Sequence, residues 1–225
     1  MKIPTWIYVL VFILAIATAC VGTNVWLHGN AHVAYCLFVF FLASNVLVCI
    51  WEICLYAHRD YVHERVDYWE QTGTTTGRTP AINYLDSRIS IAEAFTTKQW
   101  ADAWAAYSIY DRSYVDRRSY GFIVDIGNGF VTLLPTLFLL FAYTVKFRPA
   151  IVVGIVGLMV SWQWIHATAM YIASFFIAQR QKLIPKLQTN ILIWGINTAW
   201  ILFGLLGGYV SVRLIIENNY TVFGT

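Results

Sequence analysis

The chain has 225 residues, of which 59% are hydrophobic and only 12% are charged. A soluble domain has about 25% charged residues, so this composition excludes an ordinary soluble protein and predicts an integral membrane protein. The net charge of +3 is small and the basic residues are scattered, which argues against binding to nucleic acid.

Five apolar segments are each long enough to cross a hydrocarbon core about 30 Å thick. The sequence therefore predicts an all-α fold, a single membrane domain over residues 1–225 that forms a bundle of five transmembrane helices. A long extramembrane loop, residues 58–119, is expected between the second and third helices. The predicted spans are 4–27, 32–57, 120–145, 150–178 and 190–215.

The segment 58–119 differs in composition from the spans. It begins with alternating charges, and residues 71–80 are rich in Gly and Thr and lack apolar side chains, which predicts an exposed loop. From Ile89 to Tyr110 apolar residues return at mixed spacing, as is typical of an amphipathic helix lying on a membrane surface.

The four cysteines all lie in apolar segments. Their spacing matches no zinc-binding pattern, so we expect buried free thiols. We expect neither a metal nor a cofactor.

Two carboxylates lie inside predicted spans. Glu52 precedes the loop-side end of the second span by about five residues, and Asp125 follows the loop-side start of the third by about five, so both are about 8 Å deep. A charge at the bilayer centre costs about 3 kcal/mol or more and usually has a function. A pair at matched depth supports proton transfer, because one carboxyl can hold a proton while the other accepts one. The alternative is two charges near the interface that reach toward water.

Other spans bring polar or aromatic side chains to neighbouring depths. A lone intramembrane Asn is more often a hydrogen-bonding residue between helices, and a lone His or Trp is more often a packing residue. Spacing of three or four residues nevertheless puts each group on one helix face, so we predict that they line a common cavity. The groups are Asn45 and Cys49 with Glu52, Asn128 with Asp125, Gln163 with His166, and Asn197 with Trp200.

A more specific pattern lies in the segment before the third span. Trp104, Tyr107, Asp111 and Tyr114 read W-x2-Y-x3-D-x2-Y, and the acidic Asp125 follows fourteen residues after the aspartate.

Asn197 and Trp200 then form N-x2-W in the last span, and Glu52 lies in the helix before the long loop. Together these motifs resemble the EXPERA superfamily, which includes the emopamil-binding proteins, sterol isomerases that move a ring double bond, and the sigma-two receptor. The resemblance covers residues 40–212 of the chain.

The resemblance implies a role for each matched residue. Glu52 and Asp125 would be the proton-transfer pair of a sterol delta-8,delta-7 isomerase-like double-bond shift. Asn197 would hydrogen-bond the site, and Trp200 would face a carbocation or the amine of a ligand. Trp104, Tyr107, Asp111 and Tyr114 would be structural, holding the loop over the cavity mouth.

The resemblance also implies a sterol-like or cationic amphiphilic ligand taken from among membrane lipids and, in a eukaryote, an endoplasmic reticulum location. Val48 stands where the isomerases have a histidine, which leaves open a non-catalytic protein that binds a lipid or an amine. The long loop leaves open a homodimer or an accessory subunit of a membrane complex, and the aromatic, apolar helices permit a membrane terpene cyclase.

Overall fold

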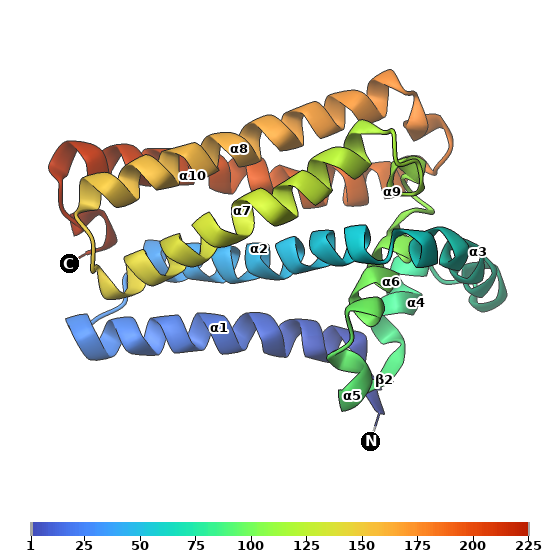
Figure 1. The fold of residues 1–225 in the computed structure, drawn as a ribbon, viewed down its shortest axis with the longest axis horizontal. Helices are drawn as coiled ribbons and strands as arrows, with labels where there is room; N and C mark the ends of the chain where they lie inside the picture. The colour runs from blue at the N-terminus through green and yellow to red at the C-terminus, as the bar shows by residue number, and fades with distance from the viewer. Residues whose placement is uncertain (1, 225) are drawn as a thin grey trace.

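A computed structural model describes residues 2–224 and shows an integral, multi-pass membrane protein built as a helical bundle. Within that range five helices are long and apolar enough to cross a membrane, and they run side by side (Figure 1). The fifth begins with one turn, α9, and a π-helix, η3, before it becomes regular. The bounds are α1 (Thr5–His28), α2 (Val33–Ala57), α7 (Tyr120–Val145), α8 (Ala150–Ile177), α9 (Lys186–Gln188), η3 (Thr189–Gly195) and α10 (Ile196–Glu217).

The tightest helix pair is α8 with α10, which approach each other over small residues. A Cβ atom added to Gly154 would lie 2.7 Å from the Ser211 carbonyl oxygen, and one added to Gly204 would lie 3.1 Å from the Ser161 carbonyl oxygen. Because lipid offers no hydrophobic drive for helix association, close backbone packing of this kind is what holds membrane helices together.

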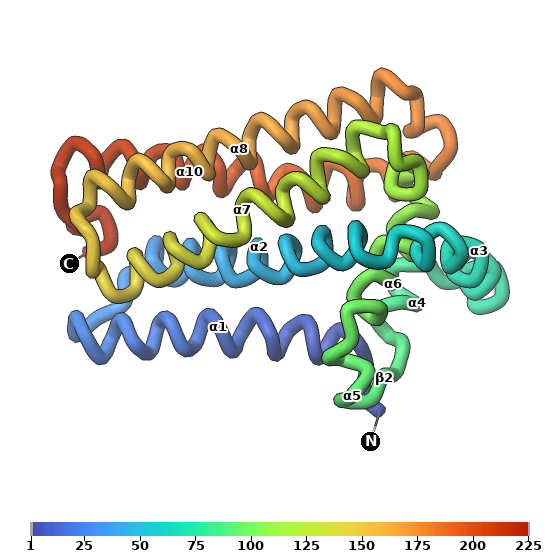
Figure 2. Tube along the Cα trace, viewed as in Figure 1, coloured from blue at the N-terminus to red at the C-terminus, as the bar shows by residue number. Residues whose placement is uncertain are grey.

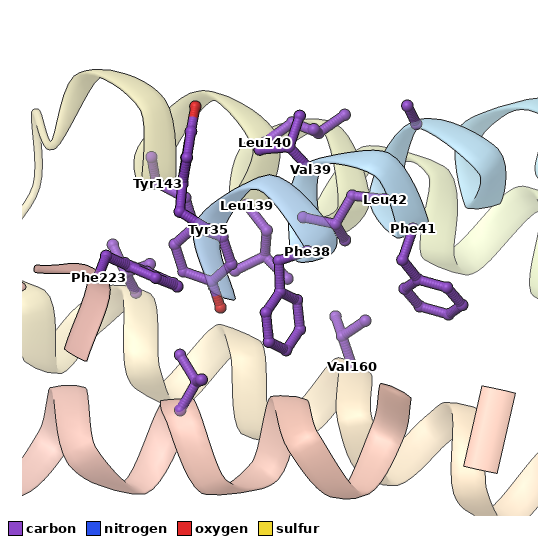
Figure 3. Packing of buried hydrophobic residues seen from close by; sticks show 14 of the residues in the cluster. Tyr35, Phe38, Val39, Phe41, Leu42, Leu139, Leu140, Tyr143, Val160 and Phe223 are labelled. Atoms are coloured by element: carbon purple, nitrogen blue, oxygen red, sulfur yellow. The ribbon is translucent and has the colours of Figure 1, made fainter. Parts of the chain in front are cut away.

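The core of the bundle is aromatic at the end where the C-terminus lies. Tyr35 and Phe38 of α2, Tyr143 of α7 and Phe223 are all buried there (Figure 3). The Phe223 ring packs edge-on against Tyr35 at 5.9 Å and Tyr143 at 4.9 Å between centroids. The short 3-10 helix η4 (Thr221–Phe223) thus closes this end of the bundle.

The opposite end carries a cap of short helices (Figure 1). This cap is the segment 58–119, which the sequence predicted to be a loop; the prediction is not confirmed, because most of the segment is folded. Its elements are α3 (Arg59–Thr76), α4 (Pro80–Asp86), β2 (Arg88–Ser90), α5 (Ile91–Ala94), α6 (Thr97–Tyr107) and the 3-10 helix η1 (Arg112–Val115).

The Gly- and Thr-rich stretch is helical as far as Thr76, where an exposed loop was expected. Four threonine hydroxyls donate to carbonyl oxygens four residues earlier, for example Thr72 to Tyr68 at 2.7 Å and Thr76 to Thr72 at 2.8 Å. These bonds satisfy the hydroxyls within the helix. Gly77, with φ of 64°, then ends it in the left-handed conformation that favours glycine.

The residues from Ile89 to Tyr110 do not form one surface helix. They are divided among β2, α5 and α6, and α6 buries Ala101, Asp102 and Ala105 within the cap. Trp104 of α6 donates its indole N–H to the Trp51 carbonyl oxygen of α2 at 2.7 Å, so the cap is fastened directly to the end of a spanning helix.

The strand β1 (Lys2–Pro4) pairs antiparallel with β2, the one departure from an all-α fold in the described residues. Thr5, the first residue of α1, adds a backbone bond of 2.9 Å to the Ser87 carbonyl oxygen. The start of the chain is therefore bound to the cap, and the Cα trace in Figure 2 shows α1 running from there along the edge of the bundle.

Candidate functional site

A cavity of about 220 Å³ lies where the cap meets α2, α7, α8 and α10. Most of its wall is aromatic or aliphatic, and two carboxyl groups and two amides interrupt it. An apolar cavity with a few convergent polar groups is the usual form of a small-molecule site. The lining residues are Val48, Trp51, Glu52, Ala103, Trp104, Tyr107, Tyr114, Asp125, Asn128, Trp164, Ala167, Thr168, Tyr171, Ile196, Asn197 and Trp200.

Glu52 is held from across the α2–α7 interface. Its side chain is only 3% exposed. The Asn128 amide nitrogen donates to both of its carboxylate oxygens, at 3.0 and 2.8 Å. The helices come this close because residue 129 is glycine, and a Cβ atom there would lie 2.8 Å from the Glu52 Cβ.

Asp125 lies one helical turn before Asn128 and lines the same cavity. If both were ionised, the charges of Asp125 and Glu52 would repel each other. Tyr114 of the cap lines the same cavity as Asp125. The structure thus brings both predicted carboxyl groups to one cavity.

Two tyrosines of the cap, Tyr107 and Tyr114, line the cavity with protonated phenol groups. Burial raises the pKa of Tyr107 and of Tyr114 above the ordinary value of 10.0. Both phenols therefore keep their protons at neutral pH. Tyr107 donates to the Leu192 carbonyl oxygen at 3.3 Å, which joins the cap to the π-helix.

The two predicted residues of the last span also line the cavity. The Asn197 amide nitrogen donates to the carbonyl oxygens of Leu192 at 3.3 Å and Ile193 at 2.9 Å, so it stabilises the π-helical segment that leads into α10. The Trp200 indole N–H donates to the Asn45 side-chain oxygen at 3.0 Å, and its ring edge packs on Phe41.

Asp111 is fully buried but does not line the cavity. It accepts hydrogen bonds from the Tyr171 hydroxyl at 2.8 Å and the Ser113 backbone N–H at 2.9 Å. Arg180 faces it at 3.5 Å. Asp111 therefore joins the cap to α8, beneath the residues that form the cavity wall.

His166 and Gln163 are not at the cavity, and the prediction that they line it is wrong. The inward face of α8 is set by Trp164, Thr168 and Tyr171, which recur every three or four residues. His166 lies two residues from Trp164, about 200° around the helix, and is exposed. Its ring stacks on Trp162, which is 64% exposed on the outer surface.

Sequence reasoning missed the threonines of α7 that complete the site. Thr132 donates to Asn128 at its carbonyl oxygen, 2.8 Å, and at its side-chain oxygen, 3.0 Å. Thr136 accepts from the Asn45 amide nitrogen at 2.9 Å. Both lie on the Asn128 face at intervals of four residues, a period that could have identified them.

Within residues 2–224 no three His, Cys, Asp or Glu side chains are grouped so that they could hold a metal ion. The chemistry available at the cavity is that of the two carboxyl groups, their amide and phenol donors and the aromatic wall. Comparisons with protein-family models, with curated proteins and with solved structures found no match for this chain.

Proposed function

We propose that the cavity binds an apolar polycyclic lipid such as a sterol, and that Glu52 and Asp125 move a double bond in it by acid/base chemistry. The observation that carries this proposal is the presence of both carboxyl groups on one largely apolar cavity next to the Trp200 ring. The EXPERA-like motifs support the same reaction, and in a eukaryote they favour an endoplasmic reticulum location.

The reaction needs one proton given and one proton taken. The protonated carboxyl group gives its proton to one alkene carbon, and the π electron pair forms the new C–H bond. The neighbouring carbon becomes a cation, which an aromatic face such as Trp200 stabilises. The ionised carboxyl group then takes a proton from the next carbon, and that C–H pair becomes the new double bond. No electrons are gained or lost, and passing the proton between the two carboxyl groups resets the site.

The size of the cavity bears on how such a lipid would bind. Sites for drug-sized ligands usually enclose about 300–1,000 Å³, which is more than the cavity holds. We therefore expect the reacting rings to occupy it and the remainder of the lipid to lie between the helices toward the bilayer.

The test is turnover in heavy water. Purified protein in lipid nanodiscs is incubated with delta-8 sterols and related polycyclic alkenes. Products are analysed for a shifted double bond and for one deuterium on the carbon that left the original double bond. Glu52→Gln and Asp125→Asn should each lower the rate about 10²- to 10⁴-fold, the usual contribution of a general acid or base. His166→Phe, on the outer surface, should turn over normally; equal rates in all four proteins would contradict the proposal.

A second candidate is a protein that binds a lipid or an amphipathic amine without converting it. Val48 favours this candidate, because it lines the cavity where the isomerases have a histidine, and no histidine is among the described lining residues. Saturable binding of a lipophilic amine, abolished by Glu52→Gln, together with unchanged sterols after prolonged incubation, would establish it in place of the isomerase.

A further inference from the structure

A second pocket, of about 370 Å³, lies on the cap side of the molecule and shares no lining residue with the cavity that holds Glu52. It forms where α3 and the start of η1 meet the turn between α8 and α9, at the cap end of the bundle (Figure 1). Its wall combines charged side chains, Glu70, Arg112 and Arg180, with apolar ones such as Leu183. The pocket therefore has the composition of a site for a ligand with a charged end and an apolar end.

The turn between α8 and α9 is basic. Residues 178–185 join two candidate membrane spans, so the turn lies at the surface of the bilayer. Arg180, Lys182 and Lys186 occur within it or directly after it, and the sequence contains no acidic residue between Asp125 and Glu217. Basic pockets at the ends of membrane helices are typical binding sites for anionic lipid headgroups.

Arg180 is the least exposed cation of the turn, with 18% of its side chain accessible. Its Nη1 atom lies 3.5 Å from the Asp111 carboxylate, which already accepts from the Ser113 backbone N–H and the Tyr171 hydroxyl. Within residues 2–224 this nitrogen is buried and makes no hydrogen bond. A guanidinium has five donors in a planar fork that matches two oxygens of a phosphate. The ion pair with Asp111 thus holds Arg180 in place while its donors can still bind an anion.

Arg112 brings a second guanidinium to the pocket from the cap. Its Nη2 atom donates to the Glu70 carboxylate at 3.1 Å, and both side chains are about half exposed. This contact uses one nitrogen of the guanidinium, so the others can donate to a second anion. Two arginines and one glutamate give the pocket wall a net positive charge.

The apolar side chains beside these cations distinguish a lipid from a soluble anion. Leu183 lines the pocket and is 74% exposed, and Leu187, one turn further along, is 68% exposed. Large apolar side chains exposed next to a charged pocket are typical of an interaction with lipid or protein. At the end of two membrane spans the adjacent apolar material is the acyl chains of the bilayer. A soluble phosphate would make no use of these leucines.

We propose that this pocket binds the phosphate headgroup of an anionic phospholipid. Arg180 is its main anchor and Arg112 its second, while Leu183 and Leu187 contact the acyl chains. A lipid bound in this way connects the cap to the turn between α8 and α9. The proposal does not depend on the proposed isomerase, because the two sites share no residue.

The experiment measures the affinity of full-length protein in a neutral detergent for phosphatidylglycerol, by competition with a fluorescent analogue of that lipid. Phosphatidylcholine, whose headgroup has no net charge, and glycerol phosphate, which has no acyl chains, are the comparison ligands. A hydrogen bond to a charged group corresponds to about tenfold to 100-fold in affinity, so phosphatidylglycerol should bind at least about tenfold more tightly than either. Equal affinity for phosphatidylcholine would overturn the anionic site. Equal affinity for glycerol phosphate would overturn the lipid and favour a soluble phosphate.

Three variants give changes of different sign. Arg180→Gln should weaken phosphatidylglycerol binding about tenfold to 100-fold. Glu70→Gln should strengthen it about two- to fivefold, because it removes a half-exposed negative charge from the pocket wall. The matched control is Lys182→Gln, which removes an exposed positive charge two residues from Arg180 but outside the pocket, and it should change the affinity by less than about twofold.

Equal losses in Arg180→Gln and Lys182→Gln would overturn the site, since they would show only a general attraction between a basic turn and anionic lipid. If Arg180→Gln does not fold, Arg180→Lys keeps a positive charge beside Asp111 but lacks the planar fork, so it should fold and still bind more weakly than wild type. Glu70→Gln alters no buried group and provides an independent measurement. Unchanged affinity in both Arg180→Lys and Glu70→Gln would also overturn the proposal.

Discussion

Gly129 of α7 allows α2 and α7 to approach closely at Glu52. A Cβ atom at this position would lie 2.8 Å from the Glu52 Cβ and 3.0 Å from the Cys49 carbonyl oxygen. One of these neighbours is backbone, which cannot move aside without displacing α2. The hydrogen bonds between Asn128 and Glu52 therefore depend on the absence of a side chain next to Asn128.

Gly129→Ala should destabilise the protein by about 1–3 kcal/mol, the usual cost of overpacking a core. It should also weaken binding at the cavity, because α2 and α7 would be forced apart. The matched control is Gly127→Ala, since a Cβ atom there meets nothing within 4 Å. Thermal unfolding of both variants in detergent checks this. Equal melting temperatures for the two would show that the α2–α7 distance is not limited by Gly129.

The sequence predicted which types of residue occur at the site better than it predicted which side chains turn toward the cavity. Glu52, Asp125 and Asn128 could be singled out because charged and amide side chains are costly in a membrane. Asp125 and Asn128 also share one face of their helix. His166 and Gln163 met the same spacing rule, but spacing does not tell which face of α8 turns inward. That choice is made by packing, with Gly157 and Ser161 against α10 and Trp164 beside Phe41.

At the scale of elements, α3 and α6 of the cap are joined through a buried carboxylate. Asp102 of α6 accepts from the Trp69 indole at 2.9 Å and from the Arg65 guanidinium at 3.1 Å, both on α3. Burial raises the pKa of Asp102 above its ordinary value of 3.8, although the Trp69 and Arg65 contacts act in the opposite direction. Elsewhere in the cap, the Arg117 guanidinium bonded to Asp60 holds the pKa of that exposed carboxyl below its usual value.

The contributions of Asp102 and Asp60 to folding stability should change with pH in opposite directions. A pKa raised by folding means that the folded state binds the proton more tightly, so the Asp102 contribution is largest at low pH and is lost as pH rises through the folded pKa. The stability of wild type relative to Asp102→Asn should therefore fall as pH rises from 4. The stability of wild type relative to Asp60→Asn should stay constant as pH rises from 4. It should decrease only when the pH is lowered below 3.8. Melting temperatures of the three proteins from pH 3 to 8 check this. If the melting temperature of wild type relative to Asp102→Asn increased with pH, the prediction would be contradicted.

The spanning helices could be predicted almost to the residue, because length and apolar composition suffice for them. The predicted span 120–145 matches α7, whereas the last span begins earlier than the predicted residue 190. The cap could not be read in this way. Its helices are short and polar, and they are stabilised by contacts distant in sequence, such as Trp69 with Asp102, which no local pattern shows.

At the scale of the whole molecule, five spans place the cap on one side of the membrane and the C-terminus on the other (Figure 1). The turn between α8 and α9 lies on the cap side. The turns after α1 and after α7 lie on the opposite side.

Single cysteines at exposed positions should therefore fall into two groups. Thr75→Cys in the cap and Lys182→Cys should react with a membrane-impermeant thiol reagent from one side of sealed vesicles. Asn30→Cys and Arg148→Cys should react from the other side. The four native cysteines are buried or half-buried and serve as the unreactive background. Labelling of all four reporters from one side would contradict the five-span topology.

The pairing of β1 with β2 has a consequence for biogenesis. Thr5 and Ser87, which bond next to this pairing, are 82 residues apart. At about 5–20 residues per second, synthesis delivers the partner strand roughly 4–16 seconds after the first strand leaves the ribosome. α1 is hydrophobic enough to insert alone and has few residues buried by the rest of the protein. It should therefore enter the membrane first as an independent helix. It then docks late, when the cap has been translated and can bind its N-terminal strand.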